Sequence, residues 1–240
     1  MSKRGYTHIV TIIDRSGSMS SIYNATLSGY NEFLAEQKNG EGEATLTAVQ
    51  FGSSYEVTHS KLAIGEVPDL SNETYVLEGM TALLDAIGRT INSTEHDINA
   101  LPEDERPENV TFCILTDGGE NASREFTRDQ VFEMINRHEE EDNWTFLFVG
   151  ANQDAIQEGG NLGVRAGQTL SYAANCVGTQ EVFRSLSKSV SKTRCCTDSD
   201  LRGLKTMGLF DEDDWEAQKN ANAINDIDKG KSARTTLDIS

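Results

Sequence analysis

The sequence predicts an α/β fold with a mostly parallel central sheet and helices on both faces. Three observations lead to this class. Short apolar runs rich in β-branched residues recur along the chain, helical patterns separate them, and two of the runs end in an aspartate. Strands that are apolar on both faces are typical of parallel sheets covered by helices on both sides. The 240 residues suffice for one large domain with its own core.

The strands are predicted from the apolar runs. "THIVTII" at 7–13 is a near-continuous apolar run and indicates a strand buried on both faces. The runs at 44–51 and 55–64 are separated only by "GSS". Because this link is too short for a parallel crossover, we expect a hairpin that adds one antiparallel edge strand. The remaining strands are expected at 109–116, 144–150 and 168–172.

Helices are expected between these strands, and some carry a recognisable start. Ser20 or Ser21 is expected to cap the helix after the first strand. Thr127 and Gln130 form a capping box ahead of an apolar stripe. Further helical patterns cover 82–98 and 179 to about 194.

Charge and composition exclude several kinds of partner. The formal net charge of −18 would repel the phosphates of nucleic acid and of anionic membranes, so we expect neither as a partner. No apolar run approaches the about 20 residues of a membrane-spanning helix. The N-terminal segment has no apolar core of signal-peptide length, and we therefore expect a cytoplasmic protein. The four cysteines show no C-x-x-C spacing and are expected to be free thiols.

Two aspartates at strand ends are the strongest candidates for a binding site. Asp14 ends the first predicted strand, and Asp117 follows the strand at 109–116. If these strands are neighbours, both carboxylates face one crevice at the carboxyl edge of the sheet. Ser16 and Ser18 follow Asp14 at alternate positions. Carboxylates and hydroxyls together form an all-oxygen donor set, which suits a hard cation such as Mg²⁺, Mn²⁺ or Ca²⁺.

These residues resemble the metal-ion-dependent adhesion site of von Willebrand factor A (VWA) domains. "DRSGS" at 14–18 matches the D-x-S-x-S motif of that site. "GMTALLDAI" supplies the threonine of the family, Thr81, and "LTDGGEN" supplies its second aspartate, Asp117. The resemblance covers about residues 5–195 and implies a Rossmann-like VWA fold. The chain is most similar to small stand-alone cytosolic VWA proteins of bacteria and their phages.

The resemblance implies a metal-dependent protein-binding module and no catalytic activity. In the family, the serines and the threonine contact the metal directly or through water, and the aspartates often act through water. One divalent cation, Mg²⁺ first and Mn²⁺ or Ca²⁺ as alternatives, is therefore expected at Asp14, Ser16, Ser18, Thr81 and Asp117. The implied partner is a protein that presents an Asp or Glu to the metal. Self-association is a further possibility.

Two other functions stay open on the sequence alone. Phosphatases of the haloacid-dehalogenase type also carry an aspartate after the first strand of a Rossmann-like sheet. They resemble D-x-D there, and the second aspartate acts as acid and base, where this chain has Ser16. A structural assembly protein with a vestigial metal site is the third alternative.

Several polar residues near the motif are interpreted as supporting groups. We expect Asp85 to support the site or to lie on a helix surface, without binding the metal. Glu120 and Asn121 are expected to be solvated loop residues. Asn152 and Asp154 follow another strand end, and we expect them to cap the next helix, with a place at the rim of the site as the alternative.

The C-terminal segment differs in composition from the rest. We divide the chain into a VWA domain at 1–210 and an acidic, polar appendage at 211–240, which begins with "DEDDW". One interpretation is an interaction segment whose carboxylates occupy the metal site of the same or a neighbouring molecule. The other, which we favour, is a short helix packed on the domain, with its acids near the helix N-terminus.

Overall fold

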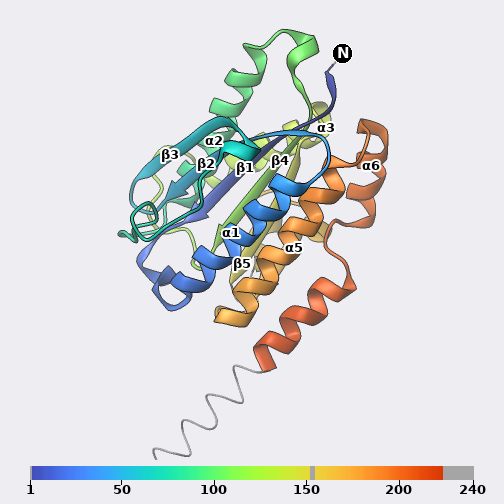
Figure 1. The fold of residues 1–240 in the computed structure, drawn as a ribbon. Helices are drawn as coiled ribbons and strands as arrows, with labels where there is room; N and C mark the ends of the chain where they lie inside the picture. The colour runs from blue at the N-terminus through green and yellow to red at the C-terminus, as the bar shows by residue number, and fades with distance from the viewer. Residues whose placement is uncertain (1, 152–154, 224–240) are drawn as a thin grey trace, which may run out of the picture.

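The computed structural model describes residues 2–151 and 155–223 and contains a six-stranded sheet (Figure 1). The strand order is β3-β2-β1-β4-β5-β6, and only the β2–β3 pair is antiparallel. The expected α/β class, the mostly parallel sheet and the antiparallel edge strand are therefore confirmed. The strands are β1 (Lys3–Asp14), β2 (Glu43–Phe51), β3 (Tyr55–Ala63), β4 (Pro107–Thr116), β5 (Thr145–Ala151) and β6 (Thr169–Tyr172).

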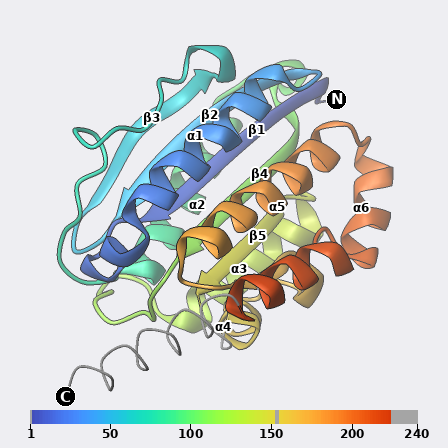
Figure 2. The same cartoon turned by 60° about the horizontal axis from the view of Figure 1, so that its bottom comes forward.

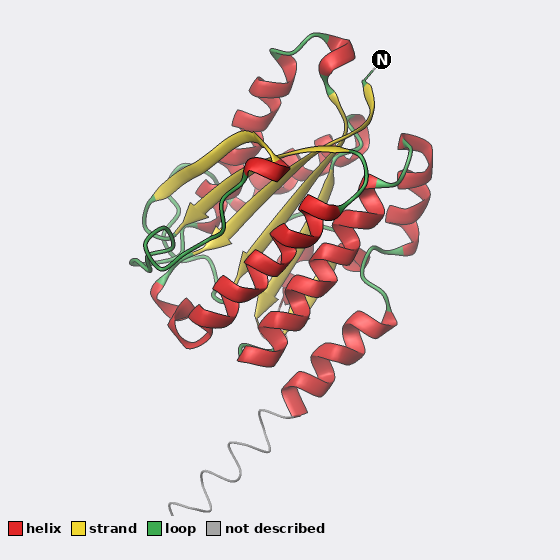
Figure 3. Ribbon diagram, in the orientation of Figure 1, coloured by secondary structure: helices red, strands yellow, loops and turns green. Residues whose placement is uncertain are grey.

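Helices cover both faces of the sheet, as expected. The helices are α1 (Tyr23–Asn39), α2 (Leu83–Asn99), α3 (Arg128–Glu141), α4 (Ala155–Asn161), α5 (Cys176–Arg194) and α6 (Asp198–Met207). Figures 1 and 3 show α1 and α5 side by side on one face, with α2 and α3 on the opposite face.

The alternation of β1 explains why the sheet has a core on each side. Ile9 and Ile13 pack into the cluster that includes the apolar residues of α1 and α5. Val10 and Ile12 point to the other face and pack into the cluster formed with α2 and α3. Successive side chains of a strand point to opposite faces, so a run of apolar residues is the pattern that a doubly covered strand requires.

The first helix begins later than expected. A 3₁₀ turn at Gly17–Ile22 separates β1 from α1, and no side chain caps α1, so the expected cap at Ser20 or Ser21 is wrong. Met19 is buried in this turn and its N–H donates to the carbonyl of Ser16 at 3.1 Å. The residues after Ser16 therefore form a turn that is anchored by the buried side chains of Met19 and Ile22 and closes the loop after β1.

Capping side chains fix the first residues of α3 and α5. The capping box of Thr127 and Gln130 is confirmed at the start of α3. The helix expected from Thr179 begins earlier, because the side chain of Asn175 accepts the N–H of Gly178 and caps α5. The sequence analysis did not anticipate α6.

A further helix over 212–223 lies against the domain beside α5 (Figure 2). The Gln218 side chain accepts the N–H of Ala173 at 3.1 Å and donates to the carbonyl of Gly178 at 3.2 Å. Gln218 is only 3% exposed. The described part of the appendage is thus a helix packed on the domain, which agrees with the interpretation that we favoured.

The first acid of the "DEDD" run is engaged by α5. Asp211 lies 2.6 Å from the ammonium of Lys188 and 3.3 Å from that of Lys192. The boundary between a domain at 1–210 and an appendage at 211–240 stays a prediction, and residues 224–240 lie outside the described part of the chain.

Two expectations from composition can be compared with the described residues. All four cysteines are free thiols, as expected, and Cys113 is buried in the core. Within residues 2–151 and 155–223, no helix has the length and apolar character needed to cross a membrane.

Candidate metal site

The two aspartates lie where the strand order reverses. β1 and β4 are parallel neighbours, with Ile13 beside Leu115. Asp14 is the last residue of β1, and Asp117 directly follows β4. The chain proceeds from β1 to one side of the sheet and from β4 to the other, so the gap between their carboxyl ends is the switch point of the fold. The sequence analysis expected both carboxylates to face one crevice if these two strands are neighbours, and they are neighbours.

Four of the five expected site residues form one continuous chain of hydrogen bonds. The N–H of Ser16 donates to Oδ1 of Asp14 at 2.7 Å. The hydroxyls of Ser16 and Ser18 are 2.9 Å apart, and the Ser18 hydroxyl donates to Oδ1 of Asp117 at 2.5 Å. Asp14 is fully buried and Ser18 is exposed, so the chain runs from the interior to the surface.

Thr81 joins this group from a third segment, just before α2. A Cβ placed on Gly118 would lie 3.5 Å from the Ser18 hydroxyl oxygen and 3.6 Å from that of Thr81. Both hydroxyls therefore border the same small space beside Asp117. The structure thus brings together all five residues that the sequence analysis selected.

The loop after Asp117 is joined to the start of α2. The Asn121 side chain accepts the N–H of Thr81 at 2.9 Å, and the Asn121 N–H donates to the Thr81 carbonyl at 3.0 Å. Glu120 accepts the N–H of Leu84 at 2.9 Å. Asn121 is an exposed loop residue, as expected, and Glu120 is partly exposed, but the expectation missed that both side chains also hold the start of α2. The first N–H groups of a helix lack partners within it, and Ala82 at the start of α2 has no capping side chain.

Asp85 makes the reciprocal connection. Its carboxylate accepts the N–H groups of Arg124, Glu125 and Phe126 at 2.8 to 2.9 Å. Burial alone would raise its pKa, but these three backbone hydrogen bonds outweigh burial and lower it. Asp85 therefore supports the site, as expected, by fixing the loop that follows Asp117.

Two contacts to Asp14 come from residues that the sequence analysis missed. The Thr116 hydroxyl donates to Oδ2 of Asp14 at 2.6 Å, and the Tyr75 hydroxyl donates to the Asp14 carbonyl at 2.6 Å. Thr116 could have been found from its place beside Asp117 at a strand end. Tyr75 carries no such signal, because it lies in a loop with no motif.

The electrostatics of the two carboxylates favour a positive charge between them. Burial raises the pKa of Asp14, and hydrogen bonds from Thr116 and Ser16 oppose this only in part. Burial also raises the pKa of Asp117 to about 6; the Ser18 hydrogen bond opposes it, and the negative charge of Asp14 adds to it. Burial and the repulsion between the two carboxylates both disfavour their charged forms, and a bound cation would offset this cost.

The chemistry of the donors fits a hard cation. Among the described residues, no three His, Cys, Asp or Glu side chains gather in a way that could hold a metal. A cation at this site would therefore depend on hydroxyl oxygens as well as on Asp14 and Asp117, and such oxygen ligands suit Mg²⁺, Mn²⁺ and Ca²⁺. Asn152 and Asp154, considered for the rim or as caps, lie outside the described residues.

Comparisons with known proteins bear on the fold. No protein-family model matches the sequence. No curated protein sequence matches it either. The fold does match solved structures. Proximal thread matrix protein 1 from the mussel byssus, described with a zinc-occupied MIDAS motif, aligns with a TM-score of 0.54 and 12% identity over 76% of this chain and 47% of its own.

Two further solved structures give similar values. The ArnB paralog VWA2 from Sulfolobus acidocaldarius aligns with a TM-score of 0.50 and 19% identity over 77% of this chain and 45% of its own. A variant of the PilB minor pilin from Streptococcus sanguinis aligns with a TM-score of 0.51 and 11% identity over 78% of this chain and 61% of its own. This chain spans less than two thirds of each of these structures. With its sheet order and its helices on both faces, the chain has the Rossmann-like fold of von Willebrand factor A domains.

Proposed function

We propose that this chain is a metal-dependent protein-binding module. One divalent cation, Mg²⁺ first and Mn²⁺ or Ca²⁺ as alternatives, is held by Ser16, Ser18 and Thr81, with Asp14 and Asp117 acting directly or through water. The observation that supports this most is the convergence of these five oxygen-bearing side chains, from three segments, at the switch point of the sheet.

The partner in this proposal is a protein that offers an Asp or Glu side chain to the cation. The attraction for that carboxylate comes from the cation itself. α1 begins only at Tyr23. At the start of α2, the N–H groups of Leu84 and Asp85 already have acceptors in Glu120 and Ser123, and the N–H of Thr81 just before the helix is accepted by Asn121. A second copy of the chain could supply the carboxylate. A cytoplasmic location, where Mg²⁺ is abundant, fits this proposal, and nucleic acid and membranes are not proposed as partners.

Metal binding is tested by thermal unfolding with and without each cation. A ligand that binds only the folded state stabilises it, by about 2.7 kcal/mol at a hundred times its dissociation constant. Ser18→Ala should abolish the rise in melting temperature. Ser20→Ala is the matched control, because Ser20 is exposed on the same turn and outside the hydrogen-bonded chain. Unchanged melting temperatures with saturating Mg²⁺, Mn²⁺ and Ca²⁺ would show that the site does not bind metal.

Partner binding is tested by affinity capture in Mg²⁺ and in EDTA. The proposal expects a protein that is retained in Mg²⁺, released by EDTA, and not retained by Thr81→Ala or Asp14→Ala. A complex that survives EDTA and both substitutions would contradict the proposed mechanism.

Binding is proposed in preference to catalysis. Ser16 occupies the place of the acid and base aspartate of haloacid-dehalogenase-type phosphatases, and a serine is a poor proton donor at neutral pH. Among the described residues, no lysine has a hydrogen bond or ion pair with Asp14 or Asp117. Mg²⁺-dependent hydrolysis of a phosphate monoester that Asp14→Asn abolishes would establish the enzyme instead. A structural protein with a vestigial site would bind its partner equally well without metal.

A further inference from the structure

Thr81 reaches the candidate metal site from a segment without regular structure. Residues 75–82, between the Tyr75 contact to Asp14 and the start of α2, contain neither helix nor strand. Ordering such a segment only when the metal binds would cost conformational entropy, so a ligand held in place beforehand binds more tightly. The position of the Thr81 hydroxyl therefore depends on the contacts of the residues before it.

Main-chain hydrogen bonds join this segment to the loop that carries the two serines of the motif. The N–H of Glu78 donates to the carbonyl of Arg15 at 2.8 Å. The N–H of Gly17 donates to the carbonyl of Gly79 at 3.2 Å. Gly79 adopts a left-handed conformation, with φ of +56°, which favours glycine. The two segments that carry the hydroxyls of the site therefore lie against each other up to two residues before Thr81.

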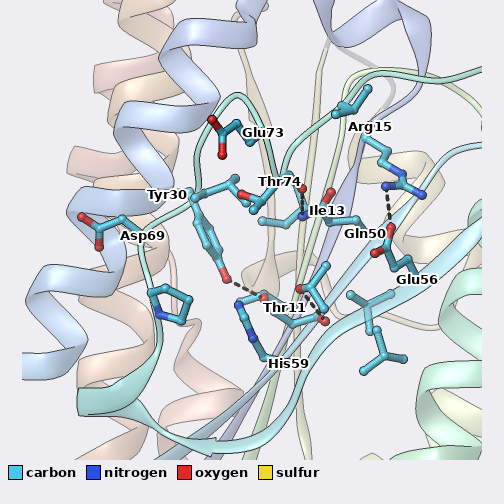
Figure 4. Close-up of a pocket in the computed structure, with 17 residues that line it drawn as sticks. Thr11, Ile13, Arg15, Tyr30, Gln50, Glu56, His59, Asp69, Glu73 and Thr74 are labelled. Atoms are coloured by element: carbon cyan, nitrogen blue, oxygen red, sulfur yellow. Dashed lines mark hydrogen bonds and ion pairs between the residues drawn. The ribbon is translucent and has the colours of Figure 1, made fainter.

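The side chain of Arg15 strengthens this contact. Arg15 stands between the first aspartate and the first serine of the motif, but its guanidinium contacts other segments. Nη1 lies 2.8 Å from Glu56 on β3, and Figure 4 shows this ion pair as a dashed line. Nη2 donates to the Ser54 hydroxyl at 2.8 Å and lies 3.4 Å from Glu78. One side chain of the motif is thus joined to β3, to the turn between β2 and β3, and to the segment that ends at Thr81.

Ser54 connects the two charged partners of this network. Its hydroxyl accepts from Arg15 and donates to the carboxylate of Glu78, and its N–H also donates to Glu78, at 2.9 Å. The neighbouring hydroxyl, that of Ser53, accepts the N–H of Met80 at 2.8 Å. The turn between β2 and β3 therefore holds the segment directly before the threonine of the site.

The charge of Arg15 alone would act against a bound cation, because like charges repel. Removing the guanidinium would then strengthen cation binding. If Arg15 instead holds the segment before Thr81, its removal weakens cation binding. The two roles therefore predict effects of opposite sign on metal affinity.

We infer that Arg15, acting through Ser54 and Glu78, positions the Thr81 hydroxyl for the metal ion without touching the ion. The inference rests on the proposed function, since it concerns the same metal site. Groups that orient metal ligands from outside the coordination shell change the affinity about tenfold to a hundredfold when they are removed. Arginine suits this role, because its planar fork of N–H groups reaches acceptors in two segments at once.

The test is the affinity of the full chain for Mn²⁺, measured by water-proton relaxation at a temperature where circular dichroism shows each variant to be folded. Ser54→Ala removes the hydroxyl that joins Arg15 to Glu78 and leaves the charge unchanged. It should weaken binding about threefold to tenfold, the effect of one hydrogen bond. Ser60→Ala is the matched control, because Ser60 is an exposed serine of β3 outside this network, and its affinity should equal that of the wild type.

Two further variants test the sign of the effect and its route. Arg15→Met should weaken binding about tenfold. Because Ser54 is exposed, Ser54→Ala tests the inference even where Arg15→Met does not fold. Adding Ser54→Ala to Thr81→Ala should weaken binding no further, since the hydroxyl that the network positions is already absent.

The outcomes separate this inference from the proposed function. Stronger binding by Arg15→Met, equal affinities of Ser54→Ala and Ser60→Ala, or full additivity of Ser54→Ala with Thr81→Ala would each overturn the inference and leave the metal site in place. A wild-type chain that binds no Mn²⁺ would contradict the proposed function, and this inference with it.

Discussion

Asp14 and Asp85 are both buried aspartates at the carboxyl edge of the sheet, yet their surroundings shift their pKa values in opposite directions. Asp85 accepts three backbone N–H groups from the loop at 124–126, and these lower its pKa despite burial. Asp14 accepts one backbone N–H and one hydroxyl, and burial raises its pKa. Hydrogen bonds therefore stabilise the charged form of Asp85, whereas burial disfavours the charged form of Asp14.

The difference distinguishes a carboxylate that holds the structure around the site, Asp85, from one that is placed to interact with a cation, Asp14. An aspartate surrounded by N–H donors has no need of a cation, and its removal leaves those donors unpaired. An aspartate beside hydroxyls and a second carboxylate lacks a positive charge, and a metal ion would supply it. Four predictions test this contrast, from the largest expected effect to the smallest.

The largest effect is expected on stability. Asp85→Ala should lower the free energy of unfolding by about 3 kcal/mol, because the N–H groups of residues 124–126 lose their acceptor. Asp14→Asn in EDTA should change it by less than about 1 kcal/mol, since the substitution also removes a buried charge. Urea unfolding of both variants measures the two values. Equal destabilisation would remove the distinction between the two aspartates.

The second effect is on the pH dependence of metal affinity. A metal ligand must be ionised, and the pKa of Asp117 is about 6 before metal binds. The affinity for the metal ion should reach its full value well above pH 6. It should fall as pH decreases through that value, by about tenfold at pH 5. Calorimetric titration with Mg²⁺ at several pH values measures the change.

The same raised pKa has the opposite consequence for metal-free stability. The folded chain holds the Asp117 proton more tightly than the unfolded chain, so this contribution is present below the ordinary aspartate pKa and is lost as pH rises through about 6. Asp117→Asn should remove that part of the pH profile in EDTA. Metal affinity that stays constant from pH 5 to pH 7.5 would contradict the account of Asp117.

The smallest effect is expected at the edge of the supporting loop. The Ser123 hydroxyl accepts the N–H of Asp85 at 3.0 Å and donates to Glu120 at 2.7 Å. Ser123→Ala should cost about 1 kcal/mol of stability and increase amide exchange in the loop after Asp117. Ser93→Ala, at an exposed serine of α2, is the control. Unchanged exchange in the loop would show that these hydrogen bonds do not hold it.

Much of the fold could be predicted because its signals are local. The apolar runs of β1, β4 and β5 identify doubly covered strands, and the three-residue link at 52–54 requires a hairpin. The start of α1 could not be predicted in this way. Ser20 and Ser21 are good capping residues, but the 3₁₀ turn that is anchored by the buried side chains of Met19 and Ile22 delays the helix. Local capping preference was overridden there by packing.

The sequence by itself determined the donor types and their order: a carboxylate and two hydroxyls after one strand, a threonine before a helix, and a carboxylate after another strand. These are local features, because strand ends and motif spacing depend on residues that are close together in the sequence. Only the tertiary structure decided that β1 and β4 are neighbours, that Tyr75 contacts Asp14, and that Asn121 is joined to Thr81. Those contacts join residues that are 40, 61 and, for Ile13 and Leu115 of the paired strands, 102 positions apart. Which distant groups satisfy a buried polar atom depends on the packing of the whole sheet, and a local pattern does not contain that information.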